Sequence, residues 1–233
     1  RTPMSYLWFD PTVSEQAPDT LPTSRLFPEK GIYAWRSSWA DSAAYFSIKS
    51  GSYFGGHEQP DAGHFILHRA GVPYVTDHGY SYWKVTDEHN VILVDGNGQA
   101  GGPLRADHSI TEPDYRIEDA FDYARGSFDQ FEQTEGEISH TRAVLYARGE
   151  FWIVIDRIET DRPRDIEVLW HFHPDCAVEA VEGRVVSTDP GKGNLAVEPV
   201  SKIDWSVQLV KGQEEPRLQG WHSERYNKAE PSP

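Results

Sequence analysis

The sequence has little cysteine and little positive charge, and it has no long apolar run. A single cysteine, Cys176, permits no internal disulfide, and we interpret it as a buried apolar side chain and not a nucleophile. No run approaches eighteen apolar residues, so no segment is predicted to span a membrane. With 22 lysines and arginines against 37 aspartates and glutamates, the formal charge is −15. That balance argues against nucleic acid as a partner, because a phosphate backbone is bound by a basic surface.

Long amphipathic helices are also missing from the pattern, and only residues 117–123 suit one or two helical turns. Aromatic and β-branched runs of strand length occur instead, as in 32–36, 44–49, 64–69 and 151–156. Nineteen glycines and sixteen prolines along 233 residues agree with many turns. Roughly a dozen strands separated by short turns predict an all-β fold, a large antiparallel β-sandwich.

The first thirty residues differ in composition from the rest. Residues 1–30 are rich in proline, serine, threonine and acidic groups, which is typical of a linker or an irregular strap from another domain. The sandwich is predicted over residues 31–233, with the polar segment 221–233 running along its surface. The chain opens on Arg1 without a signal peptide or an initiator methionine. We therefore interpret it as a mature piece or an excised part of a longer protein.

Residues 55–80 concentrate polar side chains that could carry chemistry, with four histidines and two aspartates among turn-forming glycines and prolines. In an extended segment, alternate side chains of this stretch would point to one side. If the intervening strands are antiparallel neighbours, the candidates meet at one end of the sandwich, where loops carry function. A catalytic cluster, a metal site and polar turns are all open at this point. The candidates are His57, Gln59, Asp61, Asp77 and His89.

Four ordered motifs together resemble the C-terminal β-sandwich of heparinase II/III-type polysaccharide lyases. They are Arg36-Ser37-Ser38-Trp39, GHEQPDAGHF, DHGYSYW and HNVILVDG. The similarity covers most of residues 31–175 and extends to 220–223. It implies a two-layer supersandwich of strands that follows an N-terminal α/α toroid, and this chain matches only the sandwich part. The resemblance also implies export to a bacterial periplasm or secretion.

The resemblance implies cleavage of uronic-acid polysaccharide by β-elimination in a cleft between toroid and sandwich. The chain alone is therefore expected to be inactive or nearly so. The chemistry needs a neutralised carboxylate, a base for the neighbouring proton, and an acid for the departing glycosidic oxygen. The family places a tyrosine and a histidine of the toroid at the reaction centre, with a sandwich histidine that matches His57. An imidazole could act there as base or as charged clamp. The acidic balance favours a less charged uronate polymer over heparin.

Several members of the family bind zinc, and the matching positions here are Gln59, Asp77 and His89. Gln59 departs from the histidine of the family, and an amide oxygen is a weak ligand for zinc. Three interpretations are open: the metal is absent, Gln59 binds it through its oxygen, or His64 or His78 takes its place. In each of them Asp77 and His89 could pair by hydrogen bonding and hold the loops together.

Other polar residues have simpler explanations. Asp61 is expected to cap a turn, and it could also orient the neighbouring His57. His171 and His173 are two residues apart, a spacing that also occurs in metal sites, but we expect them to belong to a packed strand.

Two rival functions stay open. The first is a non-catalytic β-sandwich that binds carbohydrate or supports a partner. The second is a metal-dependent hydrolase that activates water at Asp77 and His89. Tyr80, Tyr82 and Trp83 could stack on sugar rings, although aromatic residues of β proteins more often fill the core.

Overall fold

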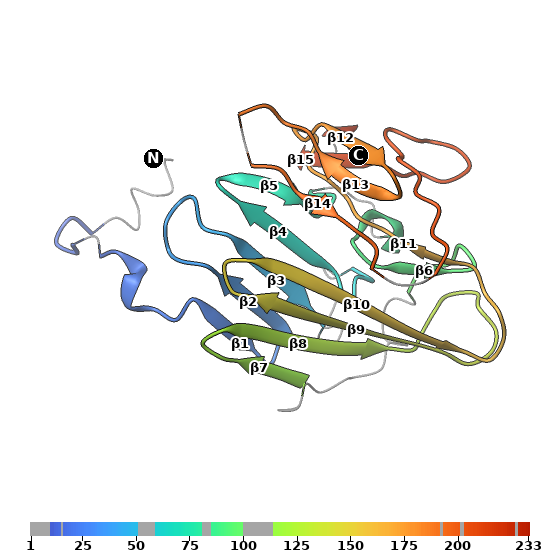
Figure 1. Ribbon diagram of the computed structural model, residues 1–233, viewed down its shortest axis with the longest axis horizontal. Helices are drawn as coiled ribbons and strands as arrows, with labels where there is room; N and C mark the ends of the chain where they lie inside the picture. The colour runs from blue at the N-terminus through green and yellow to red at the C-terminus, as the bar shows by residue number, and fades with distance from the viewer. Residues whose placement is uncertain are drawn as a thin grey trace.

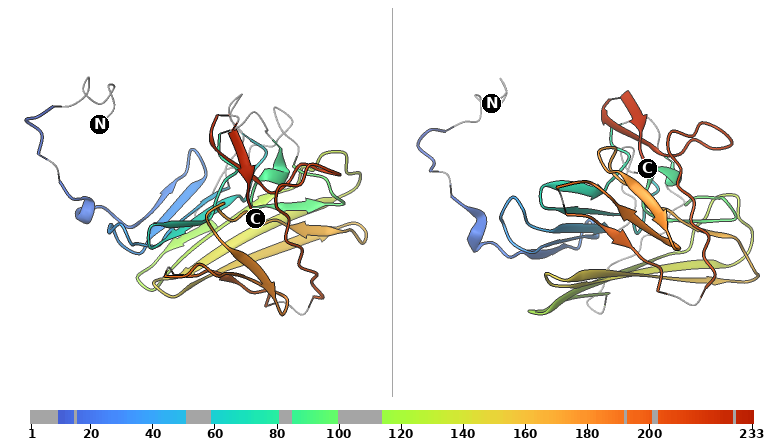
Figure 2. Two further views of the ribbon diagram at one scale, coloured as in Figure 1. Left: turned by 90° about the horizontal axis from the view of Figure 1, so that it is seen from above. Right: turned by 45° about the horizontal axis from the view of Figure 1, so that its top comes forward.

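Two antiparallel β-sheets pack face to face and form the body of the protein (Figure 1; Figure 2, right). The computed structural model describes residues 10–14, 16–50, 59–80, 85–99, 114–191, 193–200, 203–226 and 228–233. The first sheet has the order β1-β2-β3-β4-β5, with bounds Ser24–Phe27, Ile32–Arg36, Tyr45–Lys49, Phe65–Arg69 and Val72–Val75. The second has the order β10-β9-β8-β7, and in chain order the bounds of β7 to β10 are Tyr115–Ile117, Phe121–Phe128, Ile138–Ala147 and Phe151–Thr160. The predicted antiparallel β-sandwich is confirmed.

Smaller elements complete the fold, and most of them gather beside β4 and β5 (Figure 1). The edge of β5 continues through a bridge between Val75 and Phe172, which joins the C-terminal third of the chain to the first sheet. No described helix is long and apolar enough to cross a membrane. The smaller elements are η1 (Pro18–Thr20), η2 (Thr86–Glu88), β6 (Ile92–Val94), β11 (Ile166–Val168), β12 (Val178–Val181), β13 (Arg184–Ser187), β14 (Ala196–Val197), β15 (Trp221–Arg225) and β16 (Lys228–Pro231).

The alternating pattern of the strands explains how the two layers meet. In β2, Tyr33 and Trp35 are buried while their neighbours are half-buried, because successive side chains of a strand point to opposite faces. The ten residues of β9 alternate in the same way. Stacked rings of Trp35, Phe46 and Phe65 fill the space between the sheets, with centroids 5.3 and 5.4 Å apart. The aromatic residues therefore supply most of the buried surface that holds the sheets together.

Three expectations about local structure differ from the fold. Ser24–Phe27, inside the expected strap 1–30, forms β1, since Leu26 packs against the core. Residues 117–123 are not helical: β7 ends at Ile117 and β8 begins at Phe121, which makes them a hairpin. The segment 221–233 lies largely exposed at the surface as expected, but it is ordered as the β15–β16 hairpin, in which Ser223 is buried.

Candidate functional site

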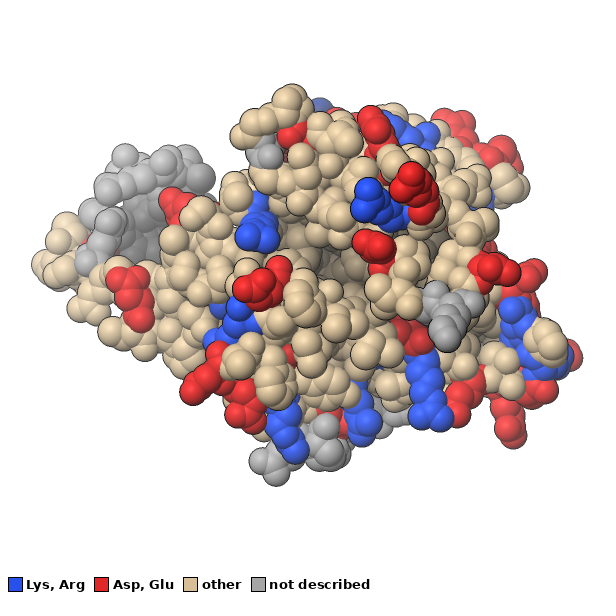
Figure 3. All heavy atoms as spheres, in the orientation of Figure 1, with Lys and Arg blue, Asp and Glu red and all other residues tan. Residues whose placement is uncertain are grey.

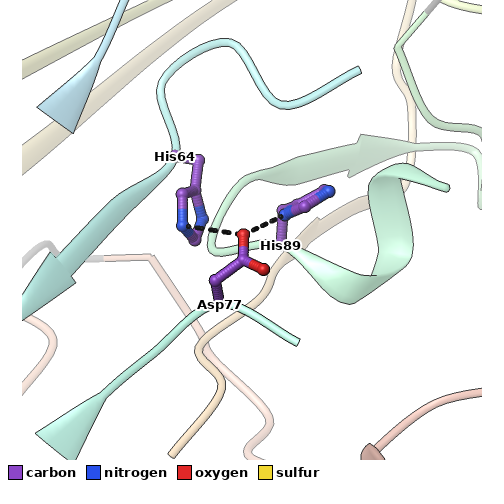
Figure 4. A group of neighbouring side chains, drawn as sticks. All are labelled: His64, Asp77 and His89. Carbon is purple, nitrogen blue, oxygen red and sulfur yellow. Dashed lines mark hydrogen bonds and ion pairs between the residues drawn. The ribbon is translucent and has the colours of Figure 1, made fainter. Parts of the chain in front are cut away.

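A cluster of histidines around Asp77 lies where several connections of the first sheet meet. His64 directly precedes β4, Asp77 follows β5, and His89 follows η2. Figure 4 shows the rings of His64 and His89 on either side of the Asp77 carboxylate. The His89 side chain is fully buried, whereas 38% of the Asp77 side chain is exposed. The cluster therefore opens to the surface through its carboxylate.

His89 bridges the two other residues that the sequence pattern grouped with it. Its Nδ1 lies 3.1 Å from Oδ2 of Asp77, and its Nε2 lies 2.9 Å from Oε1 of Gln59. The carboxylate only accepts, so Nδ1 donates to it. The carboxamide of Gln59 can accept through its oxygen or donate through its nitrogen, so it can pair with either protonation state of Nε2. The structure thus brings Gln59, Asp77 and His89 side by side.

The aspartate is held in place by the glycine two residues further on. Oδ1 of Asp77 accepts a hydrogen bond of 2.9 Å from the backbone N–H of Gly79. Gly79 has a φ of +90°, and a Cβ atom there would collide with the backbone oxygen of Ser223. The Asp-x-Gly spacing is therefore a requirement of this turn, which packs against β15.

Asn90 joins the segments that carry the cluster. Its side-chain Nδ2 donates to the backbone oxygens of Phe65 and Thr76, at 2.8 and 2.9 Å. Its Oδ1 accepts from the backbone N–H of His171 at 2.6 Å. Because one fully buried carboxamide satisfies three backbone groups, the start of β4, the end of β5 and the 171 segment are fixed relative to one another.

The electrostatics of the cluster favour an ionised Asp77 beside neutral rings of His64 and His171. Burial by itself would raise the pKa of Asp77, but the hydrogen bond from His89 and the nearby rings hold it well below its usual range. Burial lowers the pKa of His64 to about 4 and that of His171 to about 3, although Asp77 opposes both changes. Burial also raises the pKa of Glu88, whose carboxyl is fully buried, to about 7.

Three side chains are grouped as a metal site would require, but their lone pairs do not fit one. Donor atoms of His64, Asp77 and His89 all lie within 4.8 Å of one another. However, Nδ1 of His64 accepts the backbone N–H of Asn90 at 3.0 Å. The proton of the neutral ring is then on Nε2, the atom facing Asp77 at 3.4 Å, which leaves no lone pair there for a metal.

The predicted set of Gln59, Asp77 and His89 meets a different obstacle. Asp77 and Gln59 contact opposite nitrogens of the His89 ring, so their oxygens do not converge on one point beside either nitrogen. A structural zinc needs its ligands at about 2.0–2.2 Å around a single centre. His78, the other suggested substitute, is buried with Nδ1 3.4 Å from Oδ1 of Asp77. The residues as placed form a hydrogen-bonded cluster and do not fit a three-ligand zinc site.

A second buried group supports the cluster from the core side, and the sequence analysis missed it. Arg142 on β9 pairs with Asp156 on β10 through two hydrogen bonds of 2.7 and 3.0 Å. Its Nη1 also donates to the backbone oxygens of Gly63 and Asn90, immediately before His64 and after His89. The second sheet is thereby tied to both connections that carry the site.

The other predicted residues have mixed outcomes. His57, Tyr82 and Trp83 lie outside the described residues. The Asp61 side chain pairs with Lys49 at 2.7 Å, and within the described residues it forms no hydrogen bond to a backbone group of a turn.

Several aromatic and histidine side chains lie near the turn at Gly79. Tyr80 is 64% exposed, and its ring lies 4.8 Å from that of Tyr226, a neighbour that the sequence analysis did not consider. Nδ1 of His222, also missed, lies 3.1 Å from the backbone oxygen of Asp77. His171 is buried as expected, although β11 ends before it.

Comparisons with known proteins agree on one family. The family model for the heparinase II/III-like C-terminal region matches residues 19–233. A heparin-sulfate lyase of Pedobacter heparinus is 23% identical over 212 residues, which are 84% of this chain and 30% of that protein. The crystal structure of heparan sulfate lyase HepC from Pedobacter heparinus superposes with a TM-score of 0.74 at 20% identity, covering 91% of this chain and 33% of the other. A heparinase III structure gives 0.71 at 18% identity, with the same coverage. The chain thus spans about a third of the length of these relatives.

Proposed function

The chain belongs to the family of heparinase II/III-like C-terminal domains, and we propose that it is the sandwich part of a lyase that cleaves uronate-containing polysaccharide by β-elimination. The observation that carries the proposal is the joint occurrence of the family match over residues 19–233 and the Gln59–His89–Asp77 bridge. The remainder of the active site would come from an α/α toroid that this sequence does not include.

The proposed reaction is an elimination without water. A base removes the proton from the carbon beside the uronate carboxylate, and that electron pair forms a carbon–carbon double bond. The bond to the glycosidic oxygen breaks, and an acid protonates the departing oxygen. The carboxylate must be neutralised for the proton to become acidic enough. We assign His57 to this centre, as base or as charged clamp, and the acid to the toroid.

The described cluster would position that histidine and would not take part in the chemistry. Gln59 lies two residues after His57, and its side chain is held by His89, which is held in turn by Asp77. Asn90 and Arg142 fix the backbone on both sides of this bridge. Because a displacement of about 1 Å can cost a hundredfold in rate, such a brace is a requirement of the reaction.

We also propose that this brace works through hydrogen bonds and not through zinc. The proton on Nε2 of His64 and the opposite placement of Asp77 and Gln59 on His89 support this view. Asp77 and His89 would then not activate water, and a metal-dependent hydrolase is correspondingly disfavoured. Metal analysis of the purified chain provides the direct test, with less than one zinc per ten molecules expected.

The elimination is tested by offering polymers to two proteins: this chain alone and the same chain joined to its upstream region. The relative described as a heparin-sulfate lyase makes heparan sulfate the first polymer to try, with a non-sulfated uronate polymer beside it. We expect an unsaturated, ultraviolet-absorbing uronate from the joined protein only. Cleavage that yields saturated ends would contradict elimination, and a full rate from the chain alone would contradict the need for a toroid.

A further inference from the structure

The arginines of the first sheet have no carboxylate partner among the residues that the structure describes. On the face shown in Figure 3, acidic and basic side chains are interspersed without a large field of one sign. Within the described residues, however, Arg25, Arg36 and Arg69 form no ion pair. Seven arginines of other elements do pair with carboxylates, in the pairs Arg125–Asp114, Arg142–Asp156, Arg148–Asp122, Arg157–Glu159, Arg162–Asp161, Arg164–Asp95 and Arg217–Glu167, whereas Arg184 and Arg225 form no ion pair within the described residues.

The composition of the sheet strengthens this contrast. Strands β1 to β5 read SRLF, IYAWR, YFSIK, FILHR and VPYV, and they contain no aspartate or glutamate. The whole chain has 37 acidic residues against 22 basic ones. Lys49 is neutralised by Asp61, so the uncompensated charge of the strands comes from the arginines. The first sheet is therefore a locally basic part of an acidic protein.

The guanidinium of Arg36 lies close to two aromatic rings on the outer face of this sheet. Its guanidinium carbon lies 4.8 Å from the ring centroid of Trp39 and 4.5 Å from that of Tyr45. The register places Arg36, Tyr45 and His68 in one row across β2, β3 and β4. Nε1 of Trp39 donates to the backbone oxygen of Leu21 at 3.0 Å, which fixes the ring over the arginine. The side chains of this row and of Trp39 are all partly exposed.

This arrangement presents a planar fork of donors in a fixed orientation. The two rings attract the guanidinium and restrict its orientation, and its N–H donors match the two oxygens of a carboxylate or a sulfate. Aromatic rings beside it can cover the apolar face of a sugar. The next row continues the pattern, with Arg25 over the ring of Phe27 at 5.5 Å.

We propose that Arg36, Trp39, Tyr45 and His68, here called the Arg36 surface, form a second, non-catalytic contact for the acidic polysaccharide. The inference rests on the proposed function, because a lyase of this class acts on such a polymer. His68 and His64 lie four residues apart on one extended segment, which is about 13 Å at 3.3 Å per residue. A long chain could therefore contact the Arg36 surface and the Asp77 cluster at once, whereas a short oligosaccharide could not.

Calorimetric titration of the 233-residue chain with polymers tests the proposal. We expect binding to a sulfated and to a non-sulfated uronate polymer, weakening with salt, and none to neutral dextran. Tighter binding of the sulfated polymer would identify sulfate as the anion read by Arg36, and equal binding would identify the carboxylate. Arg36→Ala should weaken binding about tenfold or more, since one charge-assisted hydrogen bond is worth that much, and Tyr45→Ala should weaken it less, because it removes only a ring beside the guanidinium. Arg36→Lys should recover only part of the loss, because a lysine has no fork.

Matched controls separate this proposal from the elimination. Arg157→Ala removes the same charge from a side chain that is 72% exposed on β10 and should leave binding unchanged. Arg25→Ala, in the next row, should also weaken binding, and it serves as the test if the Arg36 variants fail to fold. In the joined enzyme, Arg36→Ala should raise KM for the polymer and preserve kcat on a short oligosaccharide. The Arg36 surface would be overturned if neither Arg36→Ala nor Arg25→Ala changed the binding of the two uronate polymers. It would also be overturned if dextran bound as tightly as these polymers, even if elimination is observed.

Discussion

The protein contains two His–Asp clusters, and they differ in the cation that holds the carboxylate. Asp156 is held by Arg142 and by Nε2 of His140 at 2.7 Å, and only 14% of its side chain is exposed. Asp77 is held by imidazoles and by the backbone N–H of Gly79, has no guanidinium partner among the described residues, and opens to the surface. In both, burial would raise the pKa of the carboxyl, and the neighbouring donors lower it below its usual range.

The Arg142–Asp156 pair therefore acts as a fixed structural framework, whereas the contacts of the Asp77 cluster can change. A guanidinium keeps its charge at every accessible pH, so the Arg142–Asp156 pair holds the two sheets to the site under all conditions. The buried imidazoles of His64 and His171, whose pKa values are lowered to about 4 and about 3, take up a proton only in acid, so the contacts around Asp77 respond to a fall in pH. The four predictions below test this division.

The largest effect is expected from Arg142→Leu. The substitution leaves Asp156 buried without its cation and removes the donor to the backbone oxygens of Gly63 and Asn90. The free energy of unfolding should fall by about 3–5 kcal/mol in urea titrations. Arg125→Leu, whose side chain is 46% exposed beside Asp114, should change it by less than about 1 kcal/mol. Similar values for the two variants would remove the distinction between framework and surface pairs.

A smaller contrast is expected between two aspartate variants. Asp156→Asn leaves the fully buried Arg142 without its counter-charge and should cost about 3 kcal/mol or more. Asp77→Asn removes an acceptor that is partly open to water, so it should cost about 1–2 kcal/mol. Both are measured by the same titration. A larger loss for Asp77→Asn would mean that the open cluster, and not the closed one, is the framework.

Stability should depend on pH through the buried histidines. The pKa of His64 and of His171 falls from 6.5 in the unfolded chain to about 4 and about 3, so the unfolded chain binds more protons between these values. Stability is therefore lost as the pH falls from 6.5 toward 4. The raised pKa of Glu88 acts oppositely, since its cost grows as the pH rises from 4.5 to about 7. His64→Gln should flatten the loss and Glu88→Gln should steepen it; unchanged slopes in thermal melts would contradict these assignments.

The smallest effect concerns metal. Gln59→His restores the histidine of the family pattern, but residue 59 still lies at the nitrogen of His89 opposite to Asp77, so zinc should shift Tm by less than about 1 °C. The parent chain should show no shift, because its ring nitrogens and Gln59 are already paired. Stoichiometric zinc in the parent chain would show that the cluster rearranges around an ion.

Much of the fold could be predicted because it is encoded locally. Aromatic and β-branched runs identified β2, β3, β4 and β10, and the loop 148–150 fixes a register that places Arg142 opposite Asp156. The missed pair therefore had a signal: a basic and an acidic residue on the inward faces of two consecutive strands. The false helix over 117–123 came from a run too short for its period to distinguish a hairpin.

The assembly of the site could not be predicted because its partners are distant in sequence. Asn90 contacts residues 25 and 81 positions away, and Gly79 packs on Ser223. No local pattern specifies such contacts; they follow from how the C-terminal third docks on β5. The resemblance to a family grouped Gln59, Asp77 and His89, but only the coordinates show that the two oxygens occupy opposite sides of one imidazole.

The most direct test of the lyase assignment is the product formed by the joined enzyme with His57→Ala and with Gln59→Ala. If His57 reacts and Gln59 positions it, unsaturated uronate should disappear with the first variant. With the second, kcat should fall by about ten- to a hundredfold while polymer binding persists. An undiminished yield of unsaturated uronate from His57→Ala would contradict the account.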